Sequence, residues 1–122
     1  MKKRPKVTPQ DFFLDYSAEI YSIFQSSMLS ESKRSATEPL FPYGIMEDLR
    51  RNPAIRKKDG KEFKIANGYR AFYLRLFLHR YDYLKSRIKL CKSIADQMTA
   101  QEMDALIKFG KVEANVFVPT LF

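Results

Sequence analysis

Residues 69–87 most restrict how this chain can fold. Apolar side chains recur there at the spacing of an α-helix and cover most of its circumference; they are Tyr69, Phe72, Tyr73, Leu76, Phe77, Tyr81 and Leu84. A helix that is apolar on most sides is buried on most sides. At 122 residues the chain has the length of one ordinary domain. The sequence therefore predicts a compact, mainly α, single-domain fold around this central helix.

A capping pattern places the first helix near the start of the chain. Thr8 is followed by a proline and, three residues on, by an aspartate, which is typical of a helix start. Apolar side chains then keep helical spacing as far as Phe24, and the polar residues 29–38 predict a loop. Before the cap, residues 1–7 predict a flexible basic arm, and residues 8–122 predict the single domain.

A short helix and a small hairpin are predicted in the middle of the chain. Residues 44–51 carry a short helical pattern, which the Asn-Pro pair after them ends. The Asp59-Gly60 pair favours a tight turn, and basic residues flank it on both sides. We therefore expect a small, basic β-hairpin at residues 54–65.

The last helix is also marked by its cap. Thr99 and the glutamate three residues later form a capping-box pattern that opens a helix at residues 100–109. Gly110 is suited to end it. The apolar residues 112–122 then predict a strand or a docked tail.

The positive charge of the chain is concentrated in its middle. Residues 50–92 hold fourteen Lys and Arg against three acidic residues, a balance of +11, whereas residues 1–49 balance at −1 and residues 93–122 at −2. A polyanion partner explains this asymmetry, because each phosphate that a protein neutralises releases condensed counterions. The alternative is a solvated basic face that only keeps the chain soluble.

Helical spacing puts Arg80, Tyr83 and Arg87 in one row. Arginine makes forked contacts with phosphate oxygens, and tyrosine stacks on bases, so this row predicts a nucleic-acid-binding surface. The other candidates for RNA contact are basic residues beside the row or in the hairpin: Arg70, Arg75, Lys85, Lys89, Lys58, Lys61 and Lys64. The same pattern also fits core tyrosines and arginines that lie over apolar neighbours.

Several kinds of site are poorly supported. Cys91 is the only cysteine and His79 the only histidine, so the chain alone builds neither a disulfide nor a Cys/His zinc site. A thiolate dyad would require the fold to bring these two together. Glu47 and Asp48 would point about 100° apart on a helix, which does not suit an acid–base pair. Because these catalytic and metal-binding patterns are poorly supported, we expect a protein that is not an enzyme and has no cofactor. No segment approaches the ~18 consecutive apolar residues of a membrane span, so we also expect a cytoplasmic protein.

Residues 39–49, Pro-Leu-Phe-Pro-Tyr-Gly-Ile-Met-Glu-Asp-Leu, resemble a motif of the FinO/ProQ family of bacterial RNA chaperones. Tyr83 at a helix end and Arg87 in an Arg-hydrophobic-x-Leu pattern resemble later parts of that family's domain. The resemblance implies a helical domain with a short β-hairpin, whose concave face binds an RNA stem and its single-stranded 3′ tail. It also implies a strand after the long helix, central roles for Tyr83 and Arg87, and phosphate contact by Arg75.

The partners that this resemblance implies are small RNAs and mRNA 3′ ends, bound by a monomeric RNA chaperone in post-transcriptional regulation. Two other functions remain open from the sequence. A DNA-binding regulator would place the long helix in a major groove, although its apolar circumference leaves little polar face for reading bases. A phage or plasmid adaptor would bind an acidic protein partner and use the apolar residues 116–122 as a docking strand.

Overall fold

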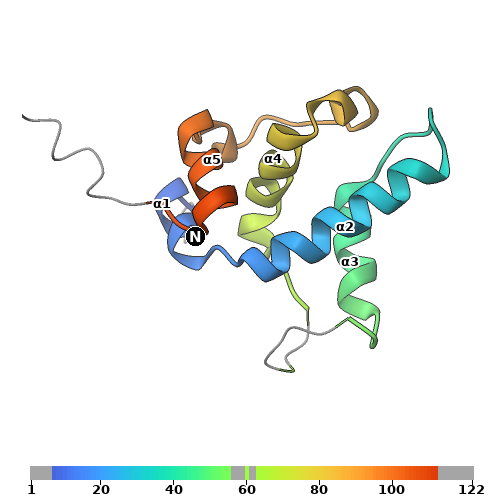
Figure 1. The fold of residues 1–122 in the computed structure, drawn as a ribbon, viewed down its shortest axis with the longest axis horizontal. Helices are drawn as coiled ribbons and strands as arrows, with labels where there is room; N and C mark the ends of the chain where they lie inside the picture. The colour runs from blue at the N-terminus through green and yellow to red at the C-terminus, as the bar shows by residue number, and fades with distance from the viewer. Residues whose placement is uncertain (1–6, 56–59, 61–62, 113–122) are drawn as a thin grey trace, which may run out of the picture.

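Helix α4 (Arg70–Arg80) lies at the centre of the molecule (Figure 1). On one side of it lie α2 (Ala18–Arg34) and α3 (Pro42–Arg51), and on the other side lies α5 (Ala100–Phe109). The structure is a computed structural model that describes residues 7–55, 60 and 63–112. Six of the eleven α4 residues are buried: Phe72, Tyr73, Leu74, Leu76, Phe77 and Leu78. This burial confirms the predicted central helix and the mainly α fold class.

The first two helices, α1 (Pro9–Asp15) and α2 (Ala18–Arg34), are separate, whereas one continuous helix was predicted. The predicted cap at Thr8 is confirmed, because its hydroxyl oxygen accepts a backbone proton from the first turn of α1. Ser17 caps α2 in the same way. The predicted loop at residues 29–38 is wrong over its first half, since α2 extends well into it.

A contact with α4 accounts for the break between α1 and α2. The Ser17 amide donates to the hydroxyl oxygen of Tyr73 at 3.0 Å. The Tyr73 ring meets Phe12 edge to face, with centroids 5.0 Å apart, and stacks on Tyr16 at 5.8 Å. The chain turns between α1 and α2 so that aromatic side chains from both sides of the turn pack on α4.

The helices predicted from local signals at α3 (Pro42–Arg51) and α5 (Ala100–Phe109) are confirmed. α3 starts slightly earlier than predicted and ends at the Asn-Pro pair. The capping box of α5 is present, because Thr99 and Glu102 each accept the other's backbone amide proton. Gly110 adopts the left-handed conformation, with φ of +78°, and thereby ends α5.

The predicted long helix ends early. α4 stops at Arg80, and after Tyr81 the chain continues as a 3-10 helix, η2 (Asp82–Arg87). Tyr81 has φ of −124° and ψ of 56°, outside the helical region. Arg80, Tyr83 and Arg87 therefore do not form the single α-helical row that was predicted. The break lets Arg87 reach the carboxyl end of α2.

The predicted β-hairpin at residues 54–65 is not seen, and residues 7–55, 60 and 63–112 contain no strand. Residues 56–59, 61 and 62 of the predicted hairpin lie outside the described residues, and its remaining residues form no hydrogen bonds between strands. Phe63 and Ile65 instead hold the chain by burying their side chains in the core, just before the 3-10 helix η1 (Asn67–Tyr69). The strand implied after Arg87 is likewise not seen, because residues 89–93 are assigned to no strand and residues 89–92 form no backbone–backbone hydrogen bond with any described residue.

Candidate nucleic-acid interface

Arg87 binds the carboxyl end of α2. Its Nη1 and Nη2 atoms donate to the carbonyl oxygens of Ser32 at 3.0 Å and Ser35 at 2.6 Å. Its Nε donates to the carbonyl oxygen of Glu38 at 2.9 Å. Carbonyl groups at a helix C-terminus lack helical partners and carry partial negative charge, which a guanidinium offsets. Arg87 thus caps α2 and uses three of its five N–H donors within the chain.

Arg70 and Arg80 also join elements of the fold. Arg70 forms an ion pair with Glu47 of α3, and the hydrogen bond from Arg70 lowers the pKa of that carboxyl below its usual value. Arg80 donates to Oε1 of Gln25 in α2 at 2.8 Å, and its guanidinium lies 5.5 Å from the Tyr81 ring centroid. Both side chains therefore hold α4 to its neighbours, and their contact with RNA stays a prediction.

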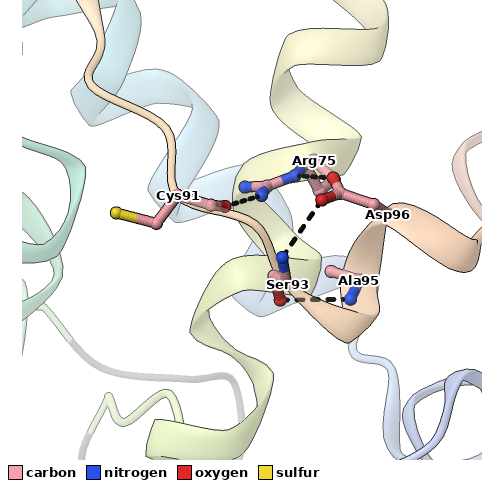
Figure 2. Close-up of polar contacts among 5 residues, drawn as sticks. All are labelled: Arg75, Cys91, Ser93, Ala95 and Asp96. Atoms are coloured by element: carbon pink, nitrogen blue, oxygen red, sulfur yellow. Dashed lines mark hydrogen bonds and ion pairs between the residues drawn. The ribbon is translucent and has the colours of Figure 1, made fainter.

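Arg75 lies at the centre of the polar cluster in Figure 2. Its Nε donates to Oδ1 of Asp96 at 2.6 Å, and its Nη2 donates to the carbonyl oxygen of Cys91 at 2.7 Å. Oδ2 of Asp96 accepts the Ser93 amide proton at 3.1 Å. The hydrogen bond from Arg75 lowers the pKa of the Asp96 carboxyl below its usual value. The cluster links α4 to the chain before and within η3 (Ile94–Gln97).

The predicted lysines differ from the arginines in their surroundings. Lys64, Lys85 and Lys89 are exposed, and none of them forms a hydrogen bond or an ion pair within the part of the chain that the structure describes. Lys58 and Lys61 lie outside the described residues. Among the candidates that the structure places, the arginines serve the fold and the lysines leave their charge at the surface.

A cavity of about 480 Å³ lies at the N-terminus of α3. Residues 39–44 form one wall, α4 forms the floor, and residues 89–93, which belong to no helix or strand, form another wall. Phe41 and Tyr43 stand at the rim with 70% and 46% of their surface exposed. An apolar cavity with exposed aromatic rings at its entrance is suited to a flat, partly apolar ligand.

Positive charge and hydrogen-bond donors converge on this cavity. Lys89 and Lys92 lie in its wall, and both are exposed. No side chain caps the N-terminus of α3, and the amides of Tyr43 and Gly44 make no hydrogen bond to other described residues. A helix N-terminus carries partial positive charge and directs its free amide protons outward, so it attracts anions. The cavity therefore combines apolar, aromatic and cationic groups.

Neither Tyr83 nor Arg87 lines this cavity. Tyr83 is 69% exposed, and its ring edge rests on Tyr81 with centroids 6.5 Å apart. Arg87 and Phe41 both line a smaller cavity of about 270 Å³. Phe41 lines both cavities, and therefore connects the surroundings of Arg87 with the entrance beside α3.

Three residues of this cavity were not predicted from the sequence as site residues: Phe41, Tyr43 and Lys92. Phe41 and Tyr43 flank a proline at a helix start that lacks a Ser, Thr, Asp or Asn cap. That missing cap was the available signal for an open helix N-terminus. Nothing local marks Lys92, because its place depends on how residues 89–93 pack against α4.

Other candidate groups have partners elsewhere. Nε2 of His79 lies 2.8 Å from Oδ1 of Asp104, so the side chain of His79 pairs with α5. Within the described residues, no cluster of three His, Cys, Asp or Glu side chains has an arrangement that could hold a metal ion. None of the described helices combines the length and the apolar character needed to cross a bilayer.

Comparisons of the chain with protein-family models, curated proteins and solved structures found no match. The resemblance of residues 39–49 to the FinO/ProQ family therefore stays a prediction.

Proposed function

We propose that the protein binds RNA without catalysing a reaction, and that the cavity beside α3 takes the single-stranded end of a structured RNA. The observation that carries this proposal is the convergence of exposed aromatic rings, exposed lysines and an uncapped helix N-terminus on one cavity. Aromatic side chains stack on bases, contributing about 1–3 kcal/mol per base. Lysines and free amide protons attract the phosphates between those bases.

Single-stranded RNA fits this cavity better than a duplex does. A base enters a cavity of this size only when it is unpaired and turned out of its stack. Helix α4, which a DNA-binding regulator would insert into a major groove, has most of its circumference buried. These two features favour an RNA end over duplex DNA.

The kind of RNA follows from the sequence resemblance. The FinO/ProQ-like motif at residues 39–49 overlaps the cavity wall formed by residues 39–44. The proposed ligand is accordingly an RNA stem with a 3′ tail, as in small RNAs and mRNA 3′ ends, and the proposed role is that of an RNA chaperone in post-transcriptional regulation. The docking strand of the alternative adaptor function, residues 116–122, lies outside the described residues.

Fluorescence anisotropy at low salt tests the proposal with three labelled ligands. These are a hairpin RNA with a single-stranded 3′ tail, the same hairpin without the tail, and duplex DNA of the same stem sequence. The tailed hairpin is expected to bind most tightly, with submicromolar affinity, and the affinity is expected to fall as salt rises. Equal binding of the tailed and blunt hairpins, or tighter binding of duplex DNA, would reject the proposal.

A further inference from the structure

The cavity wall formed by residues 89–93 has little backbone support of its own. Within the described residues, no backbone–backbone hydrogen bond involves residues 89–92. These residues also belong to no helix or strand. Side-chain contacts must therefore hold the wall that carries Lys89 and Lys92.

Arg75 supplies that support from α4. Its Nη2 donates to the Cys91 carbonyl oxygen at 2.7 Å, at a point in the chain between the two lysines. Its Nε donates to Asp96, whose other carboxylate oxygen accepts the Ser93 amide proton. The Arg75 side chain is only 10% exposed, so it is enclosed by the elements that it joins. One guanidinium thus fixes the wall directly at Cys91 and indirectly at Ser93.

We infer that Arg75 and Asp96 form a positioning pair that holds Lys89 and Lys92 at the cavity, and that the RNA affinity depends on the bond between them. This inference rests on the proposed function. It differs from the phosphate contact expected of Arg75, because here the arginine acts through the backbone of residues 91–93. It also gives an acidic residue a favourable role in binding a polyanion.

Asp96→Asn gives the decisive test, because a purely electrostatic role of Asp96 and a positioning role predict opposite changes in RNA affinity. The substitution removes a negative charge, and simple electrostatics predicts tighter binding of RNA. If Asp96 instead holds Arg75 and the wall in place, Asp96→Asn weakens binding of the tailed hairpin by about threefold or more. Asp104→Asn is the matched control. Asp104 is 54% exposed, compared with 51% for Asp96, and it also pairs with a basic side chain of α4, but its partner is His79 and it accepts no hydrogen bond from residues 89–93.

Two further variants separate positioning by Arg75 from direct phosphate contact. Arg75→Lys keeps the charge but loses the planar fork, so it is expected to bind RNA as weakly as Arg75→Met. In the double variant Arg75→Met/Asp96→Asn, the loss is expected to be no larger than in Arg75→Met alone, because both changes break one link. Full affinity in Arg75→Lys, or additive losses in the double variant, would contradict the inference.

The outcomes distinguish this inference from the function on which it rests. If the wild-type protein fails to bind the tailed hairpin, the proposed function is wrong. If the wild type binds and Asp96→Asn binds equally well or more tightly, the function stands and the positioning pair is rejected. Far-ultraviolet circular dichroism of each variant checks that a loss of affinity does not follow from unfolding.

Discussion

The Leu40 amide donates to the carbonyl oxygen of Arg87 at 2.8 Å, which joins the segment before α3 to the end of η2. The guanidinium of Arg87 binds the carbonyl oxygens of Ser35 and Glu38 in the same segment. Backbone and side chain of one residue therefore hold residues 35–40, and Phe41 follows directly at the cavity entrance. Arg87 thus influences the cavity by placing its wall.

Arg87→Met is expected to lower the free energy of unfolding by about 2–3 kcal/mol, because hydrogen bonds from a charged donor contribute roughly 1.5–3 kcal/mol and the end of α2 loses its cap. Urea unfolding followed by circular dichroism measures the effect. Arg34→Met is the control, since Arg34 is 77% exposed and, among the described residues, pairs only with Glu31 at the surface. That variant is expected to lose less than about 0.5 kcal/mol. Equal stability of the two variants would show that the Arg87 contacts contribute little.

Phe41→Ala is expected to weaken binding of the tailed hairpin by about tenfold, the effect of losing roughly 1.4 kcal/mol of base stacking. Stability should change little, because the Phe41 ring is mostly exposed. Phe109→Ala removes an aromatic ring of similar exposure from the end of α5, outside the cavity, and is expected to leave the affinity unchanged. Anisotropy titrations of both variants compare them directly. A loss of affinity shared by both would point to a nonspecific effect of aromatic residues.

Lys89→Gln and Lys92→Gln are each expected to flatten the salt dependence of RNA affinity. A lost phosphate contact changes the slope of log affinity against log salt concentration by about 0.7 for a single strand. Lys108→Gln alters an exposed lysine of α5 and is expected to keep the wild-type slope. Titrations at a series of salt concentrations give the slopes. Equal slopes for all three variants would place the phosphate contacts elsewhere.

Tyr73→Phe is expected to cost about 1–2 kcal/mol of stability, because the Ser17 amide loses its acceptor at a partly buried site. The ring itself is retained, so the packing on Phe12 should persist. Tyr83→Phe removes a hydroxyl from an exposed ring and is expected to change stability by less than about 0.5 kcal/mol. Thermal melts distinguish the two variants. A Tyr73→Phe protein as stable as wild type would mean that water replaces the lost acceptor.

Alkaline pH is expected to destabilise the fold through its tyrosines. Burial raises the pKa of Tyr16 and of Tyr73 from 10.0 to about 12, and the hydrogen bond with Asp15 is the main cause of a similar rise for Tyr69. The folded state therefore keeps protons that the unfolded state releases. Stability is expected to be unaffected by these groups below pH 10 and to fall between pH 10 and about 12. Melting temperatures across this range test the expectation, and Tyr69→Phe should reduce the decline.

The parts of the fold that the sequence predicted well depend on neighbouring residues. Thr8, Thr99 and Gly110 act within one helical turn, so their roles are readable from a few letters. The apolar pattern of α4 identifies a buried helix in the same way. Where the fold depends on local chemistry, the sequence was sufficient.

The errors concern places where distant segments decide the local structure. The break before α2 accompanies the hydrogen bond from the Ser17 amide to the hydroxyl group of Tyr73. The end of α4 accompanies the contacts of Arg87 with the end of α2, a segment more than fifty residues away. Charge patterning identified the basic region but did not separate arginines that hold the fold from lysines that leave their charge at the surface. That separation requires knowledge of which carbonyl and carboxylate groups the fold brings to each guanidinium.

The position of Cys91 offers an experimental handle. Its thiol points away from the Arg75–Asp96 pair in Figure 2, and the residue is exposed in the cavity wall. It is the only thiol of the 122-residue chain. A single maleimide reaction would therefore place one fluorophore or spin label beside the cavity, without mutagenesis, and would let its occupancy be followed in real time.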